Sequence, residues 1–324
     1  MNHKPFIAIP SGDPSGIGPE IAVKACSSKD VLDVCKPILV GSKEIFLKEV
    51  LKAGIDGSML KFEDTGSPET SCPYGVISPE SGKQAYIALK RASDMCLSGD
   101  VAAMATTPIN KESLRAAHIM TIGHTELLAE FTKTTEPVTM FRSGDMKIFF
   151  LTRHLSLMQA CEKVTYDNVF AGIKAADRAM KLLSLKEEKP LAVAGLNPHN
   201  GEHGMFGSQE EDHIVPAIEA AKSLGINVTG PVPADSVFHM VLQGRFSAVL
   251  SLYHDQGHIA AKTYDFEGTI SMTIGMPYLR TSVDHGTAFD IAGKGVADFT
   301  GMRNAIKAAA VYGYGYRENY NCFA

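Results

Sequence analysis

Short apolar runs alternate with longer amphipathic stretches along this chain. The apolar runs predict buried strands at residues 6–9, 37–40, 101–105, 147–151, 191–195, 248–253 and 270–274. The stretches between them predict helices, among them residues 20–27, 83–98, 166–183, 209–224 and 235–243. This alternation is typical of an α/β fold with a largely parallel sheet, in which ligands bind at the carboxyl ends of strands.

Polar, glycine-rich or histidine-bearing loops follow several of these predicted strands. They are residues 11–19, 106–111, 152–154, 197–204 and 254–257. A scaffold alone does not need so many such loops at strand ends, so we expect the functional residues to lie on them.

Composition narrows the class of protein. A chain of 324 residues is long for one core, so we expect two lobes. Hydrophobic residues make up 45% and charged residues 21%, as in globular proteins, and the net charge of -5 argues against a nucleic-acid partner. No apolar run is long enough to span a membrane, and the first residues do not form a secretory signal.

The six cysteines are scattered and none forms a CxxC pair. Neither a disulfide framework nor a structural zinc site is expected from this spacing. The pattern favours reduced thiols in a cytoplasmic protein.

Three histidines, His154, His199 and His254, each lie a few residues beyond a predicted strand. Three imidazoles suit a catalytic divalent cation such as zinc, cobalt or manganese. Taken singly, each could instead cap a helix or bond to a backbone carbonyl, and it is their shared placement that favours a metal site. His203 and His258 lie beside them and could orient the ligands.

Two glycine-rich segments, residues 12–20 and 284–295, could approach a flat ligand closely. No GxGxxG follows a strand, so the ordinary dinucleotide fingerprint is missing. The glycines of the first segment could equally serve turn geometry alone.

Residues 284–295 resemble the adenine-ribose loop of the isocitrate and isopropylmalate dehydrogenase superfamily, and residues 12–20 resemble its N-terminal turn. The chain is more similar still to the 4-hydroxythreonine-4-phosphate dehydrogenase (PdxA-like) family of vitamin B6 synthesis. That resemblance rests on residues 123–126, 195–199, 230–235, 253–257 and 280–288.

The resemblance implies a two-lobed isocitrate/isopropylmalate dehydrogenase-like α/β fold with the active site in the cleft. The dinucleotide-binding lobe would comprise residues 1–105 and 268–324. Residues 106–267 would form the lobe for metal, substrate and dimerisation.

The same resemblance implies roles for individual residues. His154, His199 and His254 would bind one divalent cation (zinc, manganese, cobalt or magnesium) at a site shared between the subunits of a homodimer. The substrate ligands would be His124, Thr125, Lys262, Ser271 and Arg280. The cofactor would be NAD, bound by Gly12, Asp13, His285, Gly286, Thr287, Ala288 and Asp290. The lack of a basic cluster beside Asp290 favours NAD over NADP, although Lys294 lies nearby and leaves NADP open. The catalytic residues would be Lys111, Asp235 and Asp255, with Lys111 and Asp255 as candidates for proton transfer.

Departures from the vitamin B6 enzymes bear on the substrate. Ser271 stands where they usually have asparagine, and residues 107–111 and 152–154 also differ. These variants resemble the paralogous subfamily that oxidises 4-phospho-D-threonate and 4-phospho-D-erythronate. The predicted reaction is oxidation at C3 and decarboxylation to dihydroxyacetone phosphate. The alternatives are 4-phosphohydroxy-L-threonine as substrate in pyridoxal phosphate synthesis, and a non-catalytic protein that binds a phosphorylated metabolite.

Overall fold

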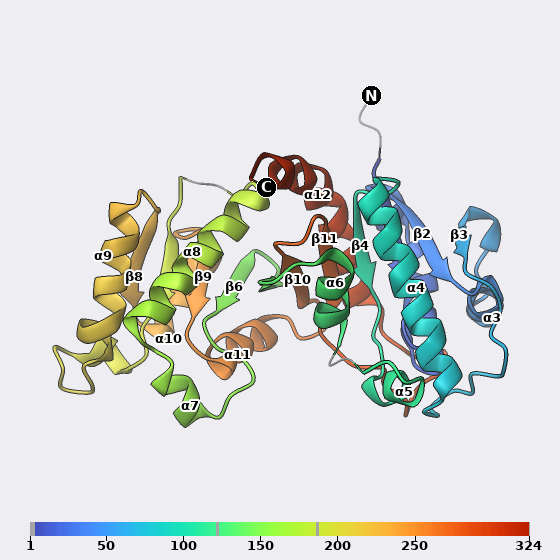
Figure 1. The fold of residues 1–324 in the computed structure, drawn as a ribbon, viewed down its shortest axis with the longest axis horizontal. Coiled ribbons are helices and arrows are strands. Elements are labelled where there is room, and N and C mark those ends of the chain that lie inside the picture. The colour runs from blue at the N-terminus through green and yellow to red at the C-terminus, as the bar shows by residue number, and fades with distance from the viewer. Residues whose placement is uncertain (1–3, 121–122, 186–187, 324) are drawn as a thin grey trace. The chain divides into compact units, whose positions relative to one another are not determined.

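A computed structural model describes residues 4–120, 123–185 and 188–323 of the chain. The chain divides into two compact units, which are treated separately below (Figure 1). Unit 1 comprises Met1–Pro137 and Ile270–Ala324, and unit 2 comprises Val138–Thr269.

The strands of unit 1 lie in the order β3-β2-β1-β4-β11-β10. Neighbouring strands are parallel except for β10 and β11, which form an antiparallel pair. The strands are β1 (Phe6–Pro10), β2 (Lys36–Gly41), β3 (Lys61–Asp64), β4 (Ala103–Thr106), β10 (Ile270–Ile274) and β11 (Leu279–Val283). β1 and β4 are almost entirely buried, as their unbroken apolar sequences require.

Helices of unit 1 pack on this sheet or on one another. They are α1 (Gly18–Cys26), α2 (Lys29–Leu32), α3 (Lys43–Ala53), α4 (Pro79–Ser98), α5 (Lys111–Ala116), α6 (His124–Thr132) and α12 (Thr300–Phe323), with a short 3₁₀ turn at Gly57–Met59. α4 packs on β1 and β2, in front of them in Figure 1, and α12 packs on β4 and β11. The Ser78 side chain caps α4 by accepting from Ser81 N, and Gly99, in the left-handed region, ends it.

The strands of unit 2 lie in the order β5-β6-β9-β7-β8. β5 and β6 form an antiparallel pair, and the other neighbours are parallel. The strands are β5 (Val138–Ser143), β6 (Met146–Phe150), β7 (Leu191–Ala194), β8 (Val228–Val232) and β9 (Ala248–Ser251).

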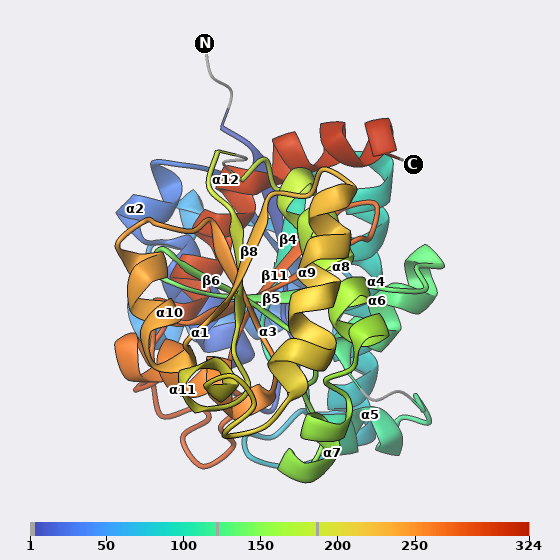
Figure 2. The same cartoon turned by 90° about the vertical axis from the view of Figure 1, so that its left-hand side faces the viewer.

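Helices lie on both faces of this second set of strands. They are α7 (Leu157–Glu162), α8 (Tyr166–Leu182), α9 (Val215–Ser223), α10 (Ala234–Leu242) and α11 (His254–Tyr264), with a 3₁₀ turn at Pro198–Gly201 and a π-helical turn at Glu210–Ile214. α8 and α9 pack together on one face, and α10 and α11 lie on the other (Figure 2).

The expected α/β architecture with largely parallel strands is confirmed, and the predicted strands match β1, β2, β4, β6, β7, β9 and β10. The prediction missed β3, β5, β8 and β11. β3 is short and charged, β8 contains Gly230 and Pro231, and β11 carries Arg280 between hydroxyl side chains, so none has a plain apolar run.

The compact units differ from the expected lobes of residues 1–105 with 268–324 and residues 106–267. Residues 106–137 lie in unit 1 because α5 and α6 pack against α4. Lys111, His124 and Thr125, expected in the second lobe, are therefore in unit 1.

In the described ranges, no helix has both the length and the apolar character needed to cross a membrane. The tyrosine-rich C-terminal segment is part of α12, where buried Tyr316 accepts a hydrogen bond from Gly275 N and donates one to Met276 O. That segment packs within unit 1.

Candidate functional site

The turn after β1 packs against the predicted adenine-ribose loop. Gly12 has a φ of +66°, and a Cβ there would lie 2.2 Å from Pro108 O. A Cβ on Gly16 would lie 2.7 Å from Thr287 Cβ, and Ile17 N donates to Thr287 O at 3.0 Å. Only glycine permits these approaches, so the turn fixes the first part of the loop.

The far end of the loop is held by α1. Glu20, which is 4% exposed, accepts a hydrogen bond from Ala297 N at 2.9 Å. Lys24 bonds to Glu20 at 2.7 Å and to Gly295 O at 2.9 Å. Sequence reasoning did not single out Lys24, and assigned Glu20 only to a glycine-rich turn.

The expected cofactor ligands fall into an exposed and a buried group. His285, Gly286 and Asp290 are exposed, and no heavy atom lies within 4 Å of a Cβ placed on Gly286. Thr287 is buried, and Ala288 has a φ of 43°, where Ile291 N donates to its carbonyl. An open surface of small residues on a fixed loop fits a flat nucleotide ligand.

Asp13, also expected to bind the cofactor, is fully buried. Its Oδ1 accepts from Ser15 N at 2.8 Å, and burial raises the pKa of its carboxyl above the ordinary value. The side chain supports the turn.

Arg280 on β11 is 6% exposed. Its Nε donates to Thr106 Oγ1 at 2.9 Å and its Nη1 to Thr273 Oγ1 at 3.1 Å. Among the described residues, no carboxylate lies within 4.0 Å of the guanidinium. Burial lowers its pKa to about 10, a value at which it still carries its charge at neutral pH.

His124 begins α6, close enough to Arg280 for the two to interact electrostatically. The residue is partly exposed, but its Nε2 is enclosed and has no partner among the described atoms. The pKa of this imidazole is well below its ordinary value. Burial is the larger cause, and the positive charge of Arg280 is the smaller one. The Glu126 carboxylate also interacts electrostatically with Arg280, but it lies beyond salt-bridge distance. A neutral imidazole beside a buried cation that makes no salt bridge can bind an anion.

Four other residues expected to bind substrate or act in catalysis lie on different elements, three of them in unit 1 and Lys262 in unit 2. Lys111 is exposed at the start of α5, and its Cε lies 3.9 Å from a Cβ placed on Gly123. Thr125 is the second residue of α6, and Ser271 on β10 pairs with Ser282. Lys262, on α11 of unit 2, lies over the Phe266 ring at 5.5 Å.

In unit 2, the three expected metal ligands follow strands β6, β9 and β7, which are parallel neighbours. The rings of His154 and His254 have centroids 6.0 Å apart. Nδ1 of His254 lies 2.7 Å from Asp255 Oδ1. When Nδ1 donates to this carboxylate, Nε2 keeps the lone pair that a metal ion needs.

His199 is the third expected metal ligand and lies in the loop after β7. It is exposed, with a φ of 51°, and its Nδ1 lies 3.8 Å from Glu202 Oε2. In the part of the chain that the structure describes, no three histidine, cysteine, aspartate or glutamate side chains form a metal-binding group. The donor chemistry of His154 and His254 fits a divalent cation, and a third ligand has to be added to them.

His258, which we expected to orient a metal ligand, lies beside His254. It is 8% exposed and stacks on His254 with ring centroids 4.1 Å apart. Phe141 and Phe150 contact its other sides. Burial lowers its pKa to about 4. His203, the other expected orienting residue, has a φ of 53° in the loop after His199.

Sequence reasoning missed two buried residues next to the histidine loops, Glu210 and Gln256. Glu210 is 2% exposed and receives hydrogen bonds from the segment before His199, and Gln256 is 9% exposed and bonds to Gly195 O. Glu210 begins a π-helical turn, a feature found often at functional sites, but charged sequence gives no signal of it.

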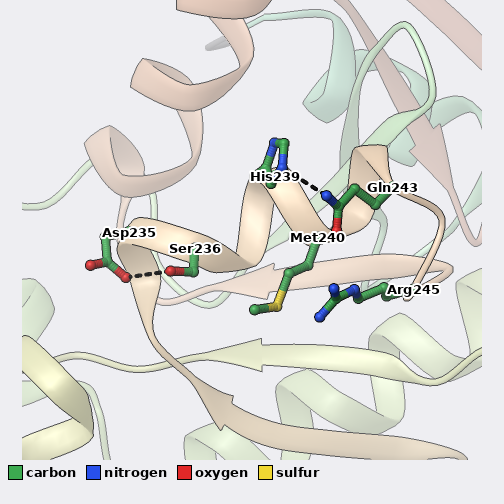
Figure 3. A pocket seen from close by; sticks show the side chains of 6 residues that line it. All are labelled: Asp235, Ser236, His239, Met240, Gln243 and Arg245. Carbon is green, nitrogen blue, oxygen red and sulfur yellow. Dashed lines mark hydrogen bonds between the residues drawn. The ribbon is translucent and has the colours of Figure 1, made fainter.

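Asp235, the remaining expected catalytic residue, lies on α10 (Figure 3). It is exposed, accepts from Ser236 Oγ at 2.9 Å, and lines a pocket of about 330 Å³ together with Ser236, His239, Met240, Gln243 and Arg245. None of the three expected metal ligands lines this pocket.

Comparison with protein families gives one match that spans most of the chain. The family described as "Pyridoxal phosphate biosynthetic protein PdxA" matches residues 33–309. Two similar proteins both carry the name "Putative D-threonate 4-phosphate dehydrogenase". That from Halalkalibacterium halodurans is 51% identical, over 96% of this chain and 98% of its own. That from Fusobacterium nucleatum is 48% identical, over 94% and 96%.

Solved structures agree in fold. The 4-hydroxythreonine-4-phosphate dehydrogenase of Klebsiella pneumoniae superposes with a TM-score of 0.85 at 34% identity, covering 97% of this chain and all of its own. The terephthalate 1,2-cis-dihydrodiol dehydrogenase of Burkholderia xenovorans gives 0.62 at 26% identity, covering 95% and 98%.

Proposed function

Because this chain belongs to the PdxA family of dehydrogenases, we propose that it oxidises D-threonate 4-phosphate with NAD and a divalent cation. Hydride leaves C3, the proton of the C3 hydroxyl passes to a base, and a 3-oxo acid results. Its C1–C2 bond then breaks, carbon dioxide departs, and protonation of C2 gives dihydroxyacetone phosphate. 4-Phospho-D-erythronate, which differs in configuration, is the second substrate we propose.

The observation that carries this proposal is the 51% identity, over nearly the whole of both chains, to a protein named for D-threonate 4-phosphate. The structure supports an anionic substrate independently. Arg280 is a buried cation with no carboxylate within 4.0 Å in the described ranges, and the Nε2 atom of His124 beside it has no hydrogen-bond partner there. Phosphate and carboxylate groups are the ligands that such a pair binds well.

We propose that His154, His199 and His254 hold the cation and that the loop at residues 284–297 holds NAD. The cation would supply positive charge that stabilises the oxygen at C3 during oxidation and decarboxylation. NAD would accept the hydride. The hydrogen bond from His254 to Asp255 fixes the imidazole in the tautomer that can bind a metal.

Lys111, Asp235 and Asp255 are the candidates for the base that takes the proton of the C3 hydroxyl. Asp255 has one carboxylate oxygen bonded to His254, which supports a role in orienting that histidine. We therefore propose Lys111, exposed at the start of α5, as the first candidate for the base. Asp235 is exposed and could exchange protons with solvent.

We further propose that the active protein is a homodimer. Among its described residues, one chain brings together His154 and His254 but no third ligand, so we propose that a second copy supplies His199. Exposed apolar side chains support this, including Leu157, Met158, Met205 and Phe206, because such surface is usually covered in an oligomer.

The substrate is tested by comparing three phosphorylated acids with NAD and manganese, following NADH absorbance. D-Threonate 4-phosphate should give the highest kcat/KM, 4-phospho-D-erythronate should be turned over, and 4-phosphohydroxy-L-threonine should be at least tenfold poorer. A preference for 4-phosphohydroxy-L-threonine would contradict the proposed substrate but not the dehydrogenase. No NADH from any of the three would contradict the enzyme itself.

A further inference from the structure

The segment before His199 is held by a single buried carboxylate. Glu210 Oε1 accepts hydrogen bonds from Leu196 N at 2.8 Å and Asn197 N at 2.7 Å, and Oε2 accepts from Asn197 Nδ2 at 2.9 Å. A Cβ on Gly201 would lie 3.0 Å from Oε2, so the loop folds around this group on both sides of His199. All three of these hydrogen bonds come from N–H groups.

A carboxylate suits this position better than its amide. Three N–H donors converge on the two oxygens of Glu210, and an ionised carboxylate offers acceptors only. A glutamine would turn an NH₂ group toward at least one of these donors. Since Glu210 is 2% exposed, water cannot easily take over the lost bond.

Gln256 links the same loop to the helix that begins with His254. Its Nε2 donates to Gly195 O at 2.8 Å, at the end of β7. Its Oε1 accepts from Leu252 N at 2.8 Å and from Ser251 Oγ at 3.1 Å, at the end of β9. Because Gln256 follows His254 by two residues on α11, its bonds tie that helix start to the neighbouring strand end.

We infer that Glu210 and Gln256 are positioning residues for the metal centre. Glu210 holds the loop that carries His199, and Gln256 fixes the start of α11, where His254 lies. The inference rests on the proposed function, because it takes these histidines to be metal ligands. Neither residue touches the metal or the substrate, and both act through hydrogen bonds to the backbone that bears the ligands.

Two isosteric substitutions separate positioning from general support of the fold. In Glu210→Gln, the new NH₂ group faces an N–H donor and one hydrogen bond is lost. In Gln256→Glu, a carboxylate oxygen faces the carbonyl oxygen of Gly195, so the hydrogen bond to that carbonyl is lost. Glu211→Gln, at an exposed neighbour, is the control for the first. Gln159→Glu is the control for the second, because Gln159 is exposed and its Oε1 accepts from Ser156 N, a bond that glutamate also accepts.

Zn²⁺ affinity is measured on each metal-stripped protein by competition with a chromophoric chelator, and stability by urea unfolding of the same samples. Both test variants should bind Zn²⁺ about 10- to 100-fold more weakly, the range found when partners of ligands are removed. Both controls should bind like the wild type. Excess Zn²⁺ should restore kcat in the test variants, and amide exchange at Leu196 and Asn197 should quicken in Glu210→Gln.

Each other outcome overturns the inference in a recognisable way. Test variants that are less stable but bind Zn²⁺ like the wild type would make these residues structural only, leaving the proposed function intact. A wild-type protein that binds no Zn²⁺, Mn²⁺ or Co²⁺ would overturn the metal centre and this inference together. If Glu210→Gln does not fold, the same measurements on Gln256→Glu decide between these outcomes.

Discussion

The residues of unit 1 that we propose for anion and cofactor binding and the histidines that we propose as metal ligands in unit 2 have different surroundings. In unit 1, buried side chains and backbone atoms fix the loop at residues 284–297, and Arg280 is enclosed between threonine hydroxyls. In unit 2, His199 and His254 have side-chain exposures of 74% and 40%. The contacts that hold the first set lie within unit 1, whereas no three potential ligands form a metal-binding group in the part of the chain that the structure describes.

The difference indicates where binding energy and assembly are needed. A preformed loop and a buried cation lose little conformational freedom when a ligand binds, which favours affinity. If another copy of the chain completes the metal site at these exposed histidines, as proposed above, activity will depend on association.

Mixing variants of the histidines should show that the metal site needs two chains. His199→Ala and His254→Ala should each lack metal-dependent turnover, because three ligands are required. Refolded together, they should recover up to about a quarter of wild-type activity, since about half of randomly formed dimers are mixed and each holds one intact site.

The control is a mixture of His154→Ala and His254→Ala. These two ligands lie together in one chain, so their mixed dimers should contain no intact site and stay inactive. Recovery in this control would show that His154 and His254 come from different chains.

Replacement of Arg280 should separate activity from stability. Arg280→Met should lower kcat/KM for the phosphorylated acid about 10²- to 10³-fold, because loss of a buried charged partner costs about 2–5 kcal/mol. The free energy of unfolding should stay the same or increase, because the apolar side chain of methionine replaces a buried guanidinium that makes no salt bridge with a carboxylate. Steady-state kinetics and urea unfolding measure the two effects.

The matched control is Arg115→Met, at an exposed position of α5. Unchanged kinetics are expected there. A fall in kcat/KM equal to that of Arg280→Met would remove the case for a specific anion site.

Gly16→Ala should show that the cofactor loop depends on the turn after β1. The new methyl group would lie 2.7 Å from Thr287 Cβ and 2.8 Å from Thr287 O. We expect a loss of about 1–3 kcal/mol in the free energy of unfolding, typical of overpacking. KM for NAD should rise about tenfold. An unchanged KM for NAD with normal stability would mean that the loop is not held by this contact.

The smallest effect expected is on the pH dependence of stability. Burial lowers the pKa of His124 well below its ordinary value. As pH falls below about 6.5, the unfolded chain takes up a proton there and the folded chain does not, so acidification favours unfolding. The stability that His124 contributes is thus present above that pH and lost below it, by at most about 1.4 kcal/mol per pH unit.

Urea unfolding at pH 7.5, 6.5 and 5.5 measures this slope, and His124→Asn should flatten it. His239→Asn, at an exposed position of α10, should leave it unchanged. Equal slopes for the wild type and His124→Asn would show that burial does not perturb His124.

The sequence predicted the strands that are apolar throughout, and with them the loops where the expected site residues lie. It could not place β5, β8 or β11, because β5 and β11 carry an arginine and β8 a glycine-proline pair. The lobe boundary was misplaced at residue 105 because the packing of α5 and α6 on α4 joins residues separated along the chain.

The motifs of this chain were enough to identify its fold class and its family, because periodicity and local spacing are properties of the sequence. They also indicated the strand ends at which we propose its functional residues. Only the tertiary structure decided that Arg280 lies near His124, that His258 stacks on His254 and that Glu210 holds the His199 loop. Burial and hydrogen bonding depend on which distant segments pack together, and a lone glutamate or glutamine in the sequence gives no sign of that.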